Sequence, residues 1–367
     1  MNNKIDWWVN VLDESDVMAV SSAMRNKSIS QGELTHQFER ELAQYLNVPY
    51  VVCASSGSAA LAMAYYACGL RVGDEILTSN VTFVATANAA LLFGAKVRAV
   101  DVNVRNVIDE NSIESQITEK TKILVPVHMN ACSCNMDKIL EIVRAHNVEV
   151  VEDACQAFSS KYSLDSVNKG KYLGTFGRFG CFSLGMAKLL TTGGGGFIVA
   201  HTQEDAELLK KIRNQGVLDV RKTCQYHQFG FNFKFTDLQA SIGLNQLKNI
   251  EGKIQRAKEI YMRYKDALGG YMQFLESDIE NGEIPMRVVA LTKHNERLKD
   301  YLLSKNIVCA LESQPLSNCS YMDIKGDFVH SDYFEKHKLI LPSGPSRSFE
   351  EVDIVCEAII EFFKRIA

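Results

Sequence analysis

One lysine in this 367-residue sequence, Lys188, stands between two apolar stretches that are typical of buried strands. Residues 180–184 are predicted to form the first strand and residues 195–200 the second. Small and apolar residues flank the lysine, and glycines that permit close backbone approach follow it. Apolar surroundings disfavour the ammonium form, so the amine becomes available as a nucleophile. The competing interpretation is a solvated loop lysine, because lysine is almost never fully buried.

Residues 55–58, with the sequence Ser-Ser-Gly-Ser, join a predicted strand to a predicted helix. Backbone N–H groups at a helix N-terminus, small hydroxyls and the helix dipole together attract a phosphate. The simpler interpretation is that Ser56 or Ser58 is an ordinary N-cap of that helix.

A carboxylate, Asp153, ends another predicted strand, and Gln156 follows three residues later. At the functional edge of a sheet, this carboxylate could hold a proton on a pyridinium nitrogen, and the amide could bond a neighbouring phenolic oxygen. The alternative is that Asp153 caps the next helix.

Three further features are weaker. Phe83 could supply an aromatic plane on which a ring stacks, although such a residue is more often part of a core. His128 is more often a histidine with satisfied hydrogen bonds than an acid or a base. The glycines at 193–196 lack the Gly-x-Gly-x-x-Gly spacing and precede a strand, so they do not predict a dinucleotide site.

These residues are positioned by strands and helices that alternate along the first two hundred residues. Predicted strands lie at 50–54, 75–78, 96–101, 122–127, 148–153, 180–184 and 195–200. Predicted helices lie at 14–26, 34–46, 59–66, 83–93, 112–117, 136–146 and 204–214. The alternation predicts an α/β fold with a mostly parallel sheet, whose ligand lies beyond the carboxyl ends of the strands.

The remaining sequence predicts a smaller α+β domain. A long helical run at 236–264 is expected to connect it to the first domain. Strands are predicted at 285–291 and 307–310, and helices at 294–305 and 350–363. We therefore expect a large domain at 1–246 and a small domain at 247–367, joined by the long helix.

The composition limits the possible functions. Apolar residues make up 46% of the chain, charged residues 23%, and the net charge is −4, which predicts a globular protein without a nucleic-acid partner. Neither a secretory signal nor a membrane-length apolar run is found, so a cytoplasmic location is expected. The ten cysteines include no Cys-x-x-Cys pair, and we expect reduced, structural thiols and no metal site.

Taken together and in this order, the motifs resemble those of the DegT/DnrJ/EryC1/StrS family of pyridoxal-phosphate-dependent sugar aminotransferases. The resemblance extends from about Ser28 to the C-terminus and is densest at 54–61, 73–76, 82–88, 152–157, 182–196 and 230–233. It implies the aspartate aminotransferase fold (fold type I), in which a mostly parallel, seven-stranded mixed sheet lies between helices.

The resemblance also implies a role for each site residue. Lys188 would bind pyridoxal 5'-phosphate covalently and catalyse proton transfer, Asp153 would pair with the pyridine nitrogen, and Gln156 would reach the 3-oxygen. Phe83 would stack on the ring. The phosphate would be held by Gly57, Ser58, Ala59 and Ser183. Asn232 would reach the partner subunit's phosphate, which implies an obligate homodimer.

The implied reaction transfers an amino group from glutamate to a nucleotide-linked keto-6-deoxy sugar, in the biosynthesis of an amino sugar for a surface polysaccharide or glycoconjugate. Three positions depart from the usual family pattern: Gly194 replaces a glutamate, Asn130 an aromatic residue, and Phe158 the histidine of sugar 3-aminotransferases. Phe158 and the segment 232–237 favour amination at C4. Amination at C3, or a non-catalytic regulatory protein with this fold, are the alternatives.

Overall fold

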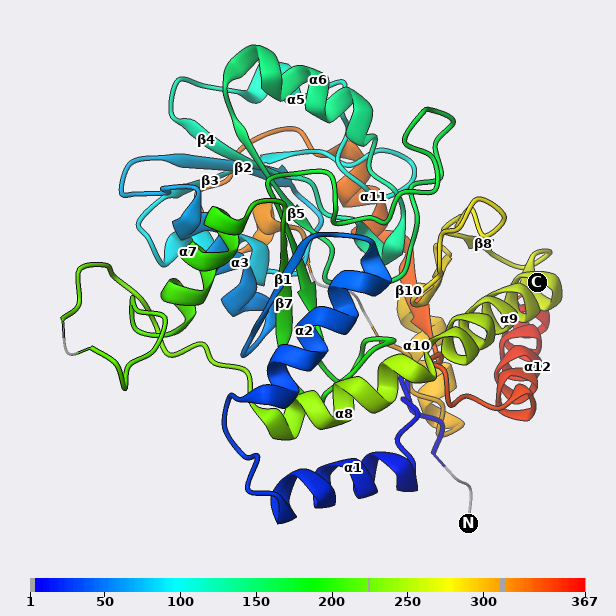
Figure 1. Cartoon of the computed structure of the whole chain (residues 1–367). Helices are drawn as coiled ribbons and strands as arrows, with labels where there is room; N and C mark the ends of the chain where they lie inside the picture. Colours follow the sequence, from blue (N-terminus) through cyan, green and yellow to red (C-terminus); the bar gives the residue numbers. More distant parts are fainter. Residues whose placement is uncertain (1–3, 224, 311–313, 367) are drawn as a thin grey trace.

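The computed structural model describes residues 4–223, 225–310 and 314–366, and its centre is a seven-stranded sheet (Figure 1). Its strands are β1 (Tyr50–Ala54), β2 (Glu75–Ser79), β3 (Lys96–Val100), β4 (Thr121–Val125), β5 (Glu149–Asp153), β6 (Phe179–Ser183) and β7 (Gly196–Ala200). They lie in the order β1-β7-β6-β5-β4-β2-β3, and only the pairs β1–β7 and β6–β7 are antiparallel. The predicted mostly parallel, seven-stranded mixed sheet is confirmed.

Helices cover both faces of this sheet (Figure 1). The helices of this part are α1 (Glu14–Arg25), α2 (Glu33–Leu46), α3 (Gly57–Ala67), α4 (Ala85–Leu91), α5 (Ile113–Gln116), α6 (Met136–His146), α7 (Gln203–Arg213) and α8 (Asp237–Lys248). Neighbouring residues of β1 point to opposite faces of the sheet and belong to two different cores. Cys53 packs on one face with residues of α2, α6 and α8, and Val52 packs on the other face with residues of α3, α4 and α7. Such burial on both faces is expected of parallel strands.

Local sequence signals account for α6, whose bounds match the prediction. The Asn135 side chain accepts a hydrogen bond from the backbone of Lys138 at the helix N-terminus, and Asn147 ends the helix in a left-handed conformation (φ 54°). Ile139 and Val143 share one buried face of the helix. Capping at both ends and this apolar spacing specify the element locally.

A second, three-stranded antiparallel sheet with the order β10-β9-β8 forms the C-terminal part. Its elements are α9 (Ile250–Leu268), β8 (Gln273–Phe274), β9 (Val288–Leu291), α10 (Asn295–Ser304), α11 (Val329–His337), β10 (Lys338–Leu341) and α12 (Phe349–Ile366). A separate core gathers Tyr264, Leu298 and Ile359 from three of its helices. The α+β composition agrees with the expected small domain, while the boundary at residue 246 stays a prediction.

Two predicted elements of this part were wrong. The helical run at 236–264 is divided at Asn249 (φ −103°, ψ 12°), whose N–H bonds the carbonyls of Gln246 and Leu247 and thereby ends α8. Asparagine favours such local alternatives over the helix interior. The stretch 307–310 forms only isolated bridges: Ile307 pairs with Ile5, and Ala310 pairs with Ile340 of β10 at that single position.

A buried ion pair ties α2 to α7 beneath β1. Arg213 Nη1 lies 2.6 Å from Glu39 Oε1 and donates to the Cys53 carbonyl at 2.8 Å, and Glu39 also accepts the Cys53 N–H at 2.9 Å. Glu39 is 6% exposed and Arg213 is 2% exposed. Each side chain therefore depends on the other for its buried charge.

Replacing Arg213 with methionine is expected to lower the free energy of unfolding by about 3–5 kcal/mol, because it takes the guanidinium from the buried Glu39 carboxylate and leaves the exposed His36 imidazole, 3.3 Å from Glu39 Oε2, as its remaining basic neighbour. The urea midpoint measures the effect. The double variant Glu39→Gln/Arg213→Met removes both charges and should recover part of the loss. If Arg213→Met alone unfolds at the parental urea midpoint, the ion pair does not contribute the expected free energy of unfolding.

Candidate active site

A cavity of about 390 Å³ opens at the carboxyl ends of β5 and β6. All the residues predicted from the sequence line this cavity, except Ala59 and Asn232. They come from separate elements: the start of α3, the segment before α4, the end of β5 and the loop between β6 and β7. The sheet therefore brings together side chains that are more than one hundred positions apart in the sequence.

Asp153, the last residue of β5, is fixed by two hydrogen bonds. Its Oδ2 accepts a bond from Thr86 Oγ1 at 2.6 Å, and its Oδ1 accepts the Cys155 N–H at 3.0 Å. The carboxylate is 5% exposed and faces the cavity. The alternative prediction, an N-cap, was wrong, because no helix begins in the described structure between β5 and β6.

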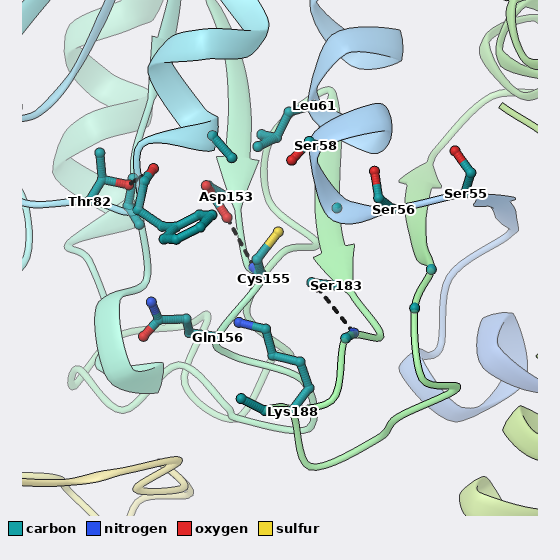
Figure 2. A pocket seen from close by; sticks show the side chains of 18 of the residues that line it. Ser55, Ser56, Ser58, Leu61, Thr82, Asp153, Cys155, Gln156, Ser183 and Lys188 are labelled. Atoms are coloured by element: carbon teal, nitrogen blue, oxygen red, sulfur yellow. Dashed lines mark hydrogen bonds between the residues drawn. The ribbon is translucent and has the colours of Figure 1, made fainter. Parts of the chain in front are cut away.

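Lys188 extends from its loop toward Cys155 and Gln156, on the side of the cavity near Asp153 (Figure 2). Burial, and secondly the positive charge of Arg287, lower the pKa of its amine from 10.5 to about 8. A larger fraction of the amine is therefore neutral at physiological pH than in an exposed lysine. The alternative of a solvated loop lysine was wrong.

The N-terminal segment holds the backbone of this loop. Asn10 Nδ2 donates to the Lys188 carbonyl at 2.6 Å and to the Met186 carbonyl at 3.1 Å, and Trp8 Nε1 donates to the same Met186 oxygen at 3.1 Å. These bonds fix the base of the lysine side chain from a segment almost 180 positions earlier. The sequence contained no signal for this contact.

The role of Arg287 in the acidity of Lys188 can be measured. In Arg287→Met, the loss of a nearby positive charge makes the ammonium form of Lys188 less unfavourable, so its pKa should rise above about 8. The pH dependence of amine modification by a limiting aldehyde, followed at Lys188 by mass spectrometry, gives the midpoint. Arg287→Lys retains the positive charge, so the pKa of Lys188 in this variant should remain near the parental value. An unchanged midpoint in Arg287→Met contradicts the assignment.

The helix α3 begins at the opposite end of the cavity. Ser56 is its N-cap, as the simpler interpretation predicted, and its Oγ accepts the Ala59 N–H at 3.0 Å. Gly57 and Ser58 line the cavity beside Ser183. A Cβ on Gly57 would lie 2.9 Å from the Cβ of Ser183, so the close approach requires glycine. The helix N-terminus therefore faces the cavity and provides an anion-binding end.

Phe83 and His128 have opposite environments. Phe83 lines the cavity with 58% of its surface exposed, which leaves the ring available for stacking. His128 is fully buried, and its Nε2 lies 2.9 Å from Glu152 Oε2. His128 is therefore a histidine with satisfied hydrogen bonds, as expected.

Asn232 is exposed and does not line the cavity of its own chain. It bridges to Asn214, and the next residue, Phe233, accepts the Ser55 N–H at 3.0 Å. The segment thus runs beside the residues that lead into α3. The role of Asn232 in a partner subunit's site stays a prediction.

Besides Trp8 and Asn10, three residues at this site were not predicted from the sequence: Thr86, Cys155 and Arg287. Thr86 holds Asp153, Cys155 lies between Asp153 and Lys188 (Figure 2), and Arg287 enters from the C-terminal part. Across the described ranges, no group of three or more His, Cys, Asp or Glu side chains could hold a metal ion. None of the helices in these ranges is both long enough and apolar enough to cross a membrane.

Comparisons with known proteins agree with this geometry. Residues 10–360 match the family model described as the DegT/DnrJ/EryC1/StrS aminotransferase family. GDP-perosamine synthase of Escherichia coli O157:H7 is 32% identical over 347 residues, which cover 91% of each chain. Among solved structures, Helicobacter pylori PseC, described as an aminotransferase involved in the biosynthesis of pseudoaminic acid, superposes with a TM-score of 0.92 at 23% identity and covers 99% of this chain and 100% of its own. The sugar aminotransferase Spr1654 of Streptococcus pneumoniae, described as putative and solved in its PLP form, has a TM-score of 0.90 at 23% identity, with 100% of both chains covered.

Proposed function

The chain belongs to the DegT/DnrJ/EryC1/StrS aminotransferase family, and we propose that it uses pyridoxal 5'-phosphate on Lys188 to transfer an amino group from glutamate to C4 of a nucleotide-linked keto-6-deoxy sugar. It is an enzyme of the aminotransferase class, and its relatives act in amino-sugar biosynthesis. The observation that carries the proposal is that Lys188 and Asp153 open on one cavity whose far end is a helix N-terminus.

The residues of the cavity fit this cofactor. Its volume of about 390 Å³ accommodates a ring with a phosphate arm. An amine of lowered pKa lies on one side, and Gly57, Ser58 and Ser183 lie at the anion-binding end. Phe83 is exposed to the cavity, as a residue that stacks on a ring must be. When bound, pyridoxal phosphate supplies an electron sink for the carbon that loses a proton.

The protein's own groups would then perform three tasks. Lys188 would hold the cofactor and would move a proton through its neutral amine, a form that its pKa of about 8 makes accessible. Asp153 would keep a proton on the ring nitrogen, and its carboxylate is oriented for this by Thr86 and the Cys155 N–H. Gln156 lies beside Lys188, and its Oε1 is oriented by the Asn130 N–H at 2.9 Å.

Amination at C4 is supported by the sequence pattern around Phe158. In the fold, Phe158 does not touch the cavity: it is 7% exposed and stacks on Tyr45, with ring centroids 5.4 Å apart. Its influence on the site of amination would therefore be indirect, through packing. The choice between C4 and C3 consequently needs a product analysis.

The test has two stages. The purified protein loaded with pyridoxal phosphate is mixed with glutamate, and its absorbance should change from the yellow form to the colourless amine form. GDP-, UDP- and dTDP-linked 4-keto-6-deoxy sugars and the corresponding 3-keto sugars are then supplied separately, and NMR of the product locates the new amine. A 4-amino product supports the proposal. A 3-amino product from a 3-keto substrate would show that the enzyme aminates C3 and not C4. If no amino acid reacts, the protein is a non-catalytic member of the fold.

The predicted homodimer belongs to the same proposal. The exposed Asn232 and the half-buried Phe233 lie beside the start of α3, from which a neighbouring subunit's phosphate end could be reached if two chains pair across this segment. Sedimentation of the loaded protein, combined with cofactor affinity in Asn232→Ala, tests this arrangement. A monomer that retains full cofactor affinity would contradict it.

A further inference from the structure

Lys253 is a buried cation that the proposed reaction does not use. It lies near the start of α9 and is 4% exposed. Burial lowers the pKa of its amine to about 8, while the carboxylates of Asp16 and Asp13 oppose this shift. Burying an ammonium group is costly unless hydrogen bonds compensate for the lost water. The contacts of this amine therefore show what the buried charge holds in place.

The Lys253 amine contacts the loop that carries Lys188. Its Nζ donates at 3.4 Å to the Leu189 carbonyl, and at the same distance to Asn10 Oδ1 and to the Val11 carbonyl. Asn10 Nδ2 in turn donates to the Lys188 carbonyl at 2.6 Å. The amine is thus linked to two consecutive carbonyls of the loop, directly to that of Leu189 and through Asn10 to that of Lys188.

Gln246 connects the same amine to α1. Gln246 Oε1 accepts a hydrogen bond from Lys253 Nζ, and Gln246 Nε2 donates to Asp16 Oδ2 at 2.7 Å. Gln246 is 3% exposed and Asp16 is 5% exposed. The amine is therefore surrounded by four oxygens, which match the three donors of an ammonium group. The Asp16 carboxylate provides a negative charge through the amide of Gln246.

The Lys188 loop (residues 184–195) is closed by backbone hydrogen bonds at its ends. The Leu184 N–H donates to the Gly195 carbonyl at 2.9 Å, and the Thr192 N–H donates to the Leu184 carbonyl at 3.0 Å. Between these ends, the carbonyls at positions 186, 188 and 189 accept hydrogen bonds from side chains outside the loop, those of Trp8, Asn10 and Lys253. Side chains from other segments therefore hold the middle of the loop.

The helix that carries Lys253 gives the amine a fixed base. Ile254 and Ala257 of α9 pack in the core of the large sheet, whereas Tyr261 and Tyr264 pack in the C-terminal core. The first residues of α9 are therefore held against the large sheet, which also positions the strands on either side of the loop. A side chain on a packed helix holds a neighbouring loop more precisely than one on another loop.

We propose that Lys253 is a positioning residue of the proposed reaction: together with Asn10, its ammonium group holds the backbone of the Lys188 loop so that the Lys188 amine is directed into the cavity. Lys253 lies outside the lining of the cavity, so it acts through Lys188 and not on a substrate. The inference rests on the proposed function for the reaction that Lys188 performs. The order of the loop and the environment of the amine are measurable without that reaction.

The test begins with the cofactor-free protein. Lys253→Met keeps the apolar stem and removes the amine. Hydrogen exchange in the peptide that covers 185–192 should become about 10- to 100-fold faster, which is the usual contribution of a hydrogen bond to a charged group. The midpoint of aldehyde modification at Lys188 should rise above about 8, because a loosened loop exposes its amine to water. The charges that act on this amine belong to groups of the cavity, so the rise reports its position and not the lost charge of Lys253.

The donor half-reaction of the loaded protein separates positioning from stability. In Lys253→Met, its limiting rate should fall about 10- to 100-fold, since a misplacement of about 1 Å can cost about 100-fold in rate. The glutamate concentration at half the limiting rate should stay nearly unchanged, because Lys253 contacts no substrate. If Lys253 only stabilised the fold, the variant would have a lower urea midpoint but the parental limiting rate per folded molecule.

Two further variants define the route of the effect. Lys248→Met removes an exposed lysine at the end of α8, and it should match the parent in every measurement. Asn10→Ala should also speed hydrogen exchange in 185–192, because it removes the bond to the Lys188 carbonyl. The double variant Asn10→Ala/Lys253→Met should change the exchange rate by less than the product of the two single effects, since both residues act on one loop.

The outcome that overturns the inference does not depend on turnover. Parental exchange in 185–192 and a parental modification midpoint at Lys188 in folded Lys253→Met would show that Lys253 does not position the loop. If Lys253→Met does not fold, Lys253→Gln, whose side chain is polar, neutral and shorter, decides the question by the same two measurements. If the parent protein converts no amino acid, the proposed function fails, while hydrogen exchange and the midpoint still decide the role of Lys253.

Discussion

Lys188→Ala is expected to fold as the parent does and to lose multiple turnover, with a fall in kcat of about 10⁴-fold or more. Its amine is the group that would bind the cofactor and move the proton, and a positioned general base alone contributes about 10²–10⁴-fold. Lys188 is also the lysine found in the lining of the cavity. The measurement is steady-state amination of the keto sugar by the variant after loading with pyridoxal phosphate.

A control variant and a chemical rescue show whether the loss of activity in Lys188→Ala comes from the missing amine. Lys293→Ala, at an exposed position outside the cavity, should retain the parental rate. Addition of a small primary amine should restore part of the activity of Lys188→Ala if the missing function is proton transfer. Normal multiple turnover by Lys188→Ala without added amine would refute the assignment of the catalytic residue.

Asp153→Asn is expected to reduce the donor half-reaction by about 100- to 1000-fold, which is the usual cost of removing one preorganised electrostatic contact in an active site. The amide keeps the size of the carboxylate, and its oxygen can still accept the bond from Thr86 Oγ1, so the fold should be preserved. It lacks the negative charge that keeps a proton on the ring nitrogen. Stopped-flow absorbance after glutamate is added measures the rate.

Thr86→Val provides the graded comparison for Asp153. It removes the 2.6 Å hydrogen bond that orients Oδ2 but leaves the charge, so a smaller loss than in Asp153→Asn is expected. If Asp153→Asn reacts with glutamate at the parental rate, the carboxylate does not act on the cofactor and its contact with Thr86 is only structural.

Local sequence signals predicted most of the large sheet and its helices. The strand β1 and the helix α6 have the predicted bounds, because an apolar run or an amphipathic period with capping asparagines specifies each of them within its own residues. The break at Asn249 was missed, since the apolar period continues from α8 into α9 and conceals the change of direction. The short strand β10 was missed as well, because its four residues pair with a strand fifty positions away.

The site was predictable where residues lie at the ends of strands or at the start of a helix. Asp153 and Ser183 each end a strand, and Gly57 begins α3, so a parallel topology places them at one edge. Arg287 and Asn10 were not predictable in this way. Each reaches the site from a different part of the chain, through tertiary contacts that no local pattern encodes.

Ala59 shows a limit of a different kind. It lies within a motif that resembles the family, but its N–H is taken by the Ser56 side chain, and Ala59 itself lies outside the lining of the cavity. A helix cap and a phosphate site use the same backbone groups, so the sequence alone does not separate the two uses. Cofactor affinity in Gly57 and Ser58 variants would show which N–H groups hold the phosphate.

The central claim is that Lys188 binds pyridoxal phosphate covalently in this cavity. The most direct measurement is reduction of the loaded protein with borohydride, followed by proteolysis and mass spectrometry of the lysine-containing peptides. The account predicts a single pyridoxyl-phosphate modification, on the peptide that contains Lys188, and the yellow absorbance should disappear on reduction. Modification of a different lysine, or a loaded protein that acquires no label on Lys188, would contradict the account.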